Sequence, residues 1–185
     1  HPSAAPLRGK GGAEPLAVQA VPEIEKLTHH LFRQLYHRQI SVQELVSTMH
    51  TFSKAQSGLE PLVYARMVQN LLGAQEHFSK YPRSELDLTA VFLGQMLRFD
   101  LIPAPNLKDA VRCVISALRT DKDSNLFRFG CLAVKQFEPR LRDFPNLKEE
   151  LSRSLAAKKI DSASLFTAVE GACNVNGEAP DFEPV

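Results

Sequence analysis

The sequence predicts an all-α fold in which antiparallel helical hairpins stack into a short HEAT-like solenoid. Apolar residues recur at helical spacing in one segment after another, which indicates about eight helices. No segment shows a sustained strand alternation with turn chemistry. Short connections join the helices and make neighbouring helices antiparallel. A closed helical bundle is the alternative architecture.

The stretch from Tyr81 to Asp100 predicts the central helix. Pro82 fits its first turn, where a missing N–H costs nothing, and Glu85 and Asp87 complement its positive end. The apolar residues beyond them fall on nearly every side of the helical wheel: Leu86, Leu88, Val91, Phe92, Leu93, Met96 and Leu97. Because a helix that is apolar all round is buried among other helices, we expect it at the centre of the fold.

Three helices are predicted before the central one. The first begins at Glu23 and carries an apolar stripe of Ile24, Leu27, Leu31, Phe32 and Leu35. The second opens at Ser41, because Glu44 three residues later completes a capping box. The third begins near Pro61 and continues to about Phe78. Each presents an apolar face to the core.

A fifth and a sixth helix follow the central one. Pro103 and Pro105 break the chain, and the next apolar stripe is the most regular of all: Leu107, Val111, Val114, Ile115 and Leu118. The sixth helix runs from about Ser124 toward Leu141, with Pro139 bending or interrupting it.

Two shorter helices, near 146–155 and 162–171, complete a helical domain that we place at residues 23–172. Two glycines, Gly94 and Gly130, lie inside helical patterns, where a missing side chain permits close helix packing.

The two ends of the chain differ in composition from this domain. Residues 1–22 include twelve Pro, Gly or Ala residues and no aromatic residue, so burial offsets little of their ordering entropy and we predict a linker. Residues 173–185 are predicted to form a flexible acidic tail. The chain lacks an initial Met, a signal-peptide core and a run of about 18 apolar residues, so we predict a cytoplasmic fragment of a larger protein with no membrane span.

Composition narrows the class of protein. The apolar fraction of 44% and the charged fraction of 23% are typical of a soluble globular domain, and the net charge of +1 gives no general attraction to nucleic acid or acidic lipid. Cys113, Cys131 and Cys173 form no CxxC pair, so we interpret them as reduced core cysteines.

No pattern of residues indicates an enzyme. The chain has no GxSxG elbow, no phosphate-cradling glycine loop and no HExxH pair. His29 and His30 are adjacent and point to different faces, and no Cys or carboxylate joins His30 and His37 at ligand spacing. We therefore predict no catalytic residue, no metal and no cofactor.

Direct RNA binding is one alternative function. Residues 105–150 hold nine basic and seven acidic side chains, a balance of +2, and Arg112, Arg119 and Arg128 are the candidate contacts. Because this excess is small, strong phosphate-driven affinity is not expected, and a solvated helical face explains the charges as well.

A groove for a peptide is the other candidate function. Phe32 and Tyr36 are one helical turn apart, and Tyr81 directly precedes the central helix. Tyr64 and Met67 form a second apolar cluster on the third helix. Aromatic residues at this spacing are usually core residues, but antiparallel helix pairs also expose shallow apolar grooves that accept amphipathic segments.

Several segments resemble one region of the largest Not subunit of the Ccr–Not mRNA deadenylase complex. The most specific are YPxxELxxTAxFxG, at Tyr81–Gly94, and FGxxAxxxFxxRLxDxP, at Phe129–Pro145. The resemblance spans about residues 28 to 172. It implies a HEAT-like helical domain related in shape to the middle domain of initiation factor four-G.

The resemblance also implies a function. In animal members this region is a non-catalytic scaffold domain that receives a short hydrophobic motif from tristetraprolin-type RNA-binding proteins, which promotes mRNA deadenylation, decay and translational repression. The family's groove uses an aromatic pair on the first helix and the Tyr of the YP step, which correspond here to Phe32, Tyr36 and Tyr81. The remaining Ccr–Not subunits would bind other parts of the scaffold.

Two departures from the family pattern accompany this resemblance. The link between the first two helices, residues 37–39, is shorter, and Ala74 and Gln75 replace bulkier or charged residues at the groove edge. We therefore expect a monomeric docking domain whose natural partner is an RNA-binding or regulatory protein, located in the cytoplasm with the nucleus as an alternative. A purely architectural spacer is the remaining alternative.

Overall fold

The computed structural model describes residues 16–161 and 163, and in this part of the chain helices are joined by short irregular links, without a strand. In chain order its helices are α1 (Leu16–Tyr36), α2 (Val42–Lys54), α3 (Glu60–Gly73), the 3₁₀ helix η1 (Ala74–Lys80), α4 (Arg83–Arg98), α5 (Ala104–Leu118), α6 (Asn125–Phe137), the 3₁₀ helix η2 (Glu138–Asp143) and α7 (Pro145–Ala157). The prediction of an all-α fold is confirmed.

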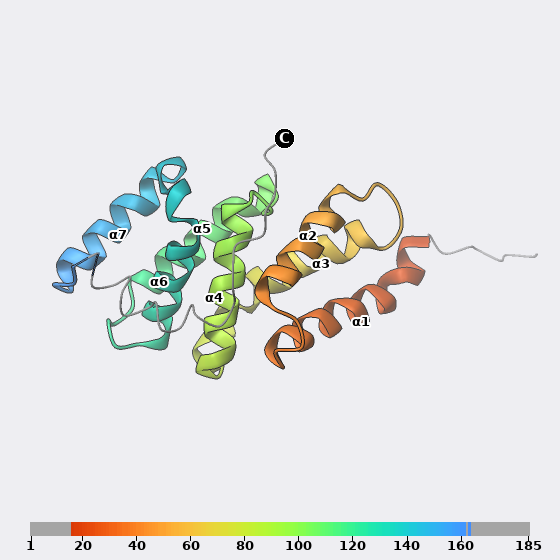
Figure 1. The fold of residues 1–185 in the computed structure, drawn as a ribbon, viewed down its shortest axis with the longest axis horizontal. Coiled ribbons are helices and arrows are strands. Elements are labelled where there is room, and N and C mark those ends of the chain that lie inside the picture. The colour runs from red at the N-terminus through yellow and green to blue at the C-terminus, as the bar shows by residue number, and fades with distance from the viewer. Residues whose placement is uncertain (1–15, 162, 164–185) are drawn as a thin grey trace, which may run out of the picture.

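The helices form two layers that are stacked from α1 at one end to α7 at the other (Figure 1). In one layer α4 lies between α2 and α6, and in the other α3 packs on α1 and α5. Ten of the sixteen residues of α4 are buried, as expected for a helix that is apolar all round. Stacked helical pairs rather than a closed bundle therefore make up this domain.

Local capping explains where α2 and α6 begin. Ser41 Oγ accepts the Glu44 N–H at 3.1 Å, and the Glu44 carboxylate accepts the Ser41 N–H at 2.7 Å, which completes the predicted capping box. Ser124 Oγ accepts the Phe127 N–H at the start of α6. Pro139 follows the end of α6 and lies in η2, as the predicted interruption requires.

Two predicted details at the N-terminal end of the fold are wrong. Helix α1 begins at Leu16, seven residues before Glu23, so residues 16–22 are helical rather than part of a linker. Pro22 lies inside α1, where it removes one helical hydrogen bond without ending the helix. Leu27, assigned to the apolar stripe, is 40% exposed, and Thr28 is fully buried instead.

Boundaries later in the chain also shift. The third helix ends at Gly73 and passes directly into η1, and Pro82 precedes the first residue of α4 instead of lying in its first turn. The predicted helix at 162–171, apart from residue 163, lies outside the described residues, as do the predicted tail 173–185, the first fifteen residues and Cys173.

Two glycines permit close helix contacts in the core: Gly94 of α4 faces α6, and Gly130 of α6 faces α5. A Cβ atom on Gly94 would lie 2.5 Å from the Ala133 carbonyl oxygen, and one on Gly130 would lie 3.0 Å from the Leu118 side chain. Both glycines therefore allow close helix packing, as the sequence predicted.

The two cysteines in the described part of the chain lie in the core. Cys113 and Cys131 are free and buried, and burial raises the pKa of each thiol to about 12. Both are therefore unreactive core thiols at neutral pH.

None of the helices in the described part of the chain is long and apolar enough to cross a membrane.

Candidate peptide-binding site

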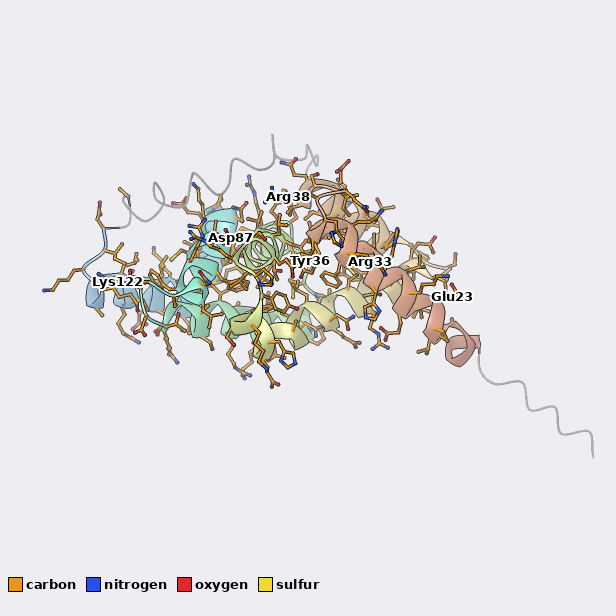
Figure 2. The ribbon with its side chains drawn as sticks, turned by 90° about the horizontal axis from the view of Figure 1, so that it is seen from below. Glu23, Arg33, Tyr36, Arg38, Asp87 and Lys122 are labelled. Atoms are coloured by element: carbon orange, nitrogen blue, oxygen red, sulfur yellow. The ribbon has the colours of Figure 1, made fainter. Side chains whose placement is uncertain are left out.

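An open pocket lies between α1, the α3–η1 junction and the start of α4. We call it the Tyr81 pocket; its volume is about 260 Å³, and its lining consists of His29, Phe32, Tyr36, Asn70, Leu71, Ala74, Phe78, Tyr81 and Thr89. Tyr36, the last residue of α1, lies near the middle of the molecule (Figure 2). The structure thus brings together the three aromatic residues that the sequence singled out.

Local backbone geometry places these aromatic rings. Phe32 and Tyr36 are four residues apart on α1, so they share a face and stack with their centroids 6.1 Å apart. Tyr81 has extended backbone angles, φ −71° and ψ 141°, because the following Pro82 disfavours helical angles at Tyr81. The Tyr81 ring meets the Tyr36 ring edge-on at 6.3 Å and the Phe78 ring at 5.4 Å. The result is a continuous aromatic wall.

Tyr36 is held in place more firmly than Tyr81. The Thr89 hydroxyl donates to the Glu85 carbonyl at 2.7 Å, so its oxygen accepts the Tyr36 O–H at 3.0 Å. Burial raises the pKa of Tyr36 to about 12, and it also raises the pKa of the more accessible Tyr81. Tyr36 therefore supports the pocket, whereas Tyr81 presents more of its ring to a ligand.

The raised pKa of Tyr36 predicts a loss of stability at high pH. Below pH 10 the Tyr36 phenol is protonated in both the folded and the unfolded chain. Between pH 10 and about 12 it ionises in the unfolded chain and stays protonated in the folded one. The unfolded state then binds fewer protons, so the free energy of unfolding falls as pH rises, by up to about 2 kcal/mol from Tyr36.

Urea unfolding of the wild type and of Tyr36→Phe across this pH range measures the effect. We expect the free energy of unfolding of the two proteins to change in parallel with pH below pH 10 and to fall more steeply for the wild type above pH 10. The buried thiols contribute equally to both proteins, so they cancel in the difference. Curves that stay parallel throughout would show that Tyr36 ionises as easily in the folded chain as in the unfolded one.

The second predicted cluster, Tyr64 and Met67, lies outside this pocket. Met67 has no exposed surface and belongs to the core, so its assignment to a peptide-binding surface is wrong. The Tyr64 hydroxyl donates to the Leu101 carbonyl at 2.7 Å and ties α3 to the turn after α4. Helical spacing alone did not separate these core positions from the pocket positions.

Six pocket residues were absent from the predicted site residues, although Ala74 had been placed at the groove edge: His29, Asn70, Leu71, Ala74, Phe78 and Thr89. His29 lies three residues before Phe32 and seven before Tyr36, so the helical spacing already placed it on their face. Phe78 carried no such signal, because its position depends on the 3₁₀ turn that follows α3.

The three candidate RNA contacts are engaged in ion pairs. Each arginine has a carboxylate within salt-bridge distance: Arg112 with Asp109 at 3.2 Å, Arg119 with Glu150 at 2.9 Å and Arg128 with Asp87 at 3.0 Å. These carboxylates neutralise part of the positive charge at all three positions, although the Arg112 and Arg119 side chains stay 60% and 63% exposed, so the geometry adds no support for strong phosphate-driven affinity.

Comparisons with known proteins give a consistent family. Residues 10–179 match the model of the CCR4-NOT transcription complex subunit 1 TTP binding domain. The chain is 34% identical over 125 residues to general negative regulator of transcription subunit 1 of Schizosaccharomyces pombe, which covers 68% of this chain and 6% of that protein. It is 30% identical over 127 residues to CCR4-NOT transcription complex subunit let-711 of Caenorhabditis elegans, which covers 68% of this chain and 5% of the relative.

A solved structure shares the fold. The N-terminal domain of yeast Not1 superposes with a TM-score of 0.71 at 21% identity, over 81% of this chain and 28% of that one. The chain thus spans only a small part of the relatives that it matches. It belongs to the family of the CCR4-NOT transcription complex subunit 1 TTP binding domain.

Proposed function

We propose that this domain docks a short hydrophobic motif of a TTP-type RNA-binding protein in the Tyr81 pocket. The observation that carries this proposal is the convergence of Phe32, Tyr36 and Tyr81 on one open cavity. The last of these is more than forty residues from the other two in sequence. The description of the family supports the class of partner.

The lining of the pocket suits an apolar side chain. Phe32, Phe78 and Leu71 provide apolar walls, and His29 and Asn70 add polar groups able to orient a peptide backbone. Aromatic anchors in such pockets usually supply most of the affinity of a short motif. The ligand is therefore expected to insert one aromatic or large aliphatic residue.

Docking would act by tethering. A message held by the RNA-binding protein would gain a raised effective concentration near the nucleases carried elsewhere on the scaffold. Deadenylation, decay and translational repression would then follow in the cytoplasm without any chemistry in this domain.

Amide NMR of the isotopically labelled 185-residue chain tests the proposal. We would titrate it with overlapping peptides that cover a TTP-type protein, and we expect at least one peptide to shift the amides of Phe32, Tyr36 and Tyr81. Because apolar contacts dominate, its affinity should change little between low and physiological salt. RNA binding through the α5–α6 region would instead weaken steeply with salt.

The absence of shifts at the Tyr81 pocket with every peptide would contradict the proposal. It would leave an architectural spacer as the remaining interpretation. Shifts confined to a different face would refute the docking site, although they would retain a docking role for the domain.

A further inference from the structure

A second pocket adjoins the first through a shared wall. We call it the Phe129 pocket; it lies between η1, α5 and α6 and has a volume of about 360 Å³. Phe78 lines both pockets, because its ring lies between them. The site already described therefore ends at a wall with another cavity on its far side.

Ring contacts show how close the two pockets are. The ring centroid of Phe78 is 5.4 Å from that of Tyr81 and 4.9 Å from that of Phe129. The ring centroids of Tyr81 and Phe129 are therefore separated by no more than the sum of these two distances. Residues three or four apart on a peptide helix have Cβ atoms about 5–6 Å apart. Such a spacing brings two side chains of one short helix within reach of both pockets.

The Phe129 pocket has apolar walls and a polar rim, as ligand-binding sites usually do. Its buried walls are apolar and include Phe78, Ala117 and Phe129, whereas Glu76 and Ser116 at its rim are exposed. Arg112 also lines the rim, but its guanidinium is paired with Asp109. The rim therefore carries one acidic and one basic side chain, and Glu76 makes no ion pair within the described part of the chain, so its carboxylate is available to a basic neighbour in a ligand.

We infer that the Tyr81 and Phe129 pockets form one groove with two anchor sites, joined across Phe78. The occupant is an amphipathic peptide segment with two apolar residues about three or four positions apart. Its first anchor enters the Tyr81 pocket, its second enters the Phe129 pocket, and a Lys or Arg beside the second faces Glu76. This inference rests on the proposed function, because the first anchor is the motif proposed there.

Filling the second pocket tests the inference. Ser116 is an exposed residue of α5 at the rim, so Ser116→Phe adds a ring to the pocket without disturbing the core. Lys108→Phe is the matched control, because Lys108 is exposed on the same helix and does not line the pocket. Unchanged far-ultraviolet circular dichroism would establish that both variants are folded.

The probe is the tightest-binding TTP-type peptide, with each apolar residue replaced by Ala in turn. We expect Ser116→Phe to weaken the intact peptide roughly tenfold and Lys108→Phe to leave the affinity unchanged. Alanine at the second anchor should also cost roughly tenfold in the wild type but have no further effect in Ser116→Phe, since both changes remove the same contact. Glu76→Gln should weaken binding by about two- to fivefold at low salt.

The outcomes separate the two proposals. A peptide that shifts the Tyr81 pocket but binds wild type and Ser116→Phe equally, without shifts on α5, would overturn the two-anchor groove and leave the docking function standing. A failure of all peptides to shift the Tyr81 pocket would overturn both.

Discussion

Replacing Tyr81 with Ala is expected to weaken binding of the docked peptide by about 1–3 kcal/mol while the domain stays folded. Tyr81 lies in the extended link between η1 and α4, is only partly buried, and forms the accessible part of the aromatic wall. Its removal opens the pocket and removes one contact with a buried ring, that of Phe78 at 5.4 Å, so we expect a small loss of stability beside the loss of affinity. Isothermal titration calorimetry with the same peptide measures the loss.

A tyrosine outside the pocket provides the control. Tyr64→Phe removes the hydrogen bond to Leu101 and should lower the free energy of unfolding by about 1 kcal/mol while leaving the peptide affinity unchanged. Phe32→Ala is a less clean test, because Phe32 also meets the fully buried ring of Phe92 edge-on at 6.3 Å. If Tyr81→Ala melts the domain instead, Tyr81 is a core residue and the docking site is misplaced.

A methyl group at position 94 is expected to destabilise the fold. In Gly94→Ala the new Cβ would lie 2.5 Å from the Ala133 carbonyl oxygen and 2.6 Å from Gln136 Cβ, well inside van der Waals contact. Because the first of these atoms is backbone, α4 and α6 must move apart. We expect the free energy of unfolding to fall by about 1–3 kcal/mol, measured by urea denaturation.

The matched control is Gly73→Ala, at the last position of α3. A Cβ there meets nothing within 4 Å, and the backbone is already helical at φ −69°. Alanine should therefore be neutral, or stabilising by up to about 1 kcal/mol. Equal stabilities for the two variants would mean that α4 and α6 pack less closely than described.

Predictions based on neighbouring residues were confirmed more often than those based on burial. The capping box at Ser41 and the cap at Ser124 each involve atoms only three residues apart, and both helix starts were predicted correctly. The start of α1 was wrong because residues 1–22 were judged together by their Pro, Gly and Ala content, whereas residues 16–21 contain neither Pro nor Gly and include two Ala.

The burial of residues along α1 shows why apolar periodicity did not predict all the core residues correctly. A hydrophobic pattern selects Leu27, yet the neighbouring helices enclose Thr28 and leave Leu27 against a shallow cavity near Phe52. Likewise, Met67 and Phe32 are both apolar residues at helical spacing, but only Phe32 lies beside an opening. The pattern identifies which face of a helix is apolar, but it does not tell whether that face packs against another helix or lines a pocket.

By itself the sequence determined that α1 to α7 are helices, although not all of their bounds, together with the central position of α4 and the close packing at Gly94, because capping, proline geometry and apolar periodicity act within a few residues. Only the tertiary structure decided which aromatic rings line a pocket and which cations are neutralised. Tyr36 meets Thr89 across 53 positions, and Arg128 meets Asp87 across 41. Such contacts depend on how whole helices stack, and no local pattern of residues encodes that arrangement.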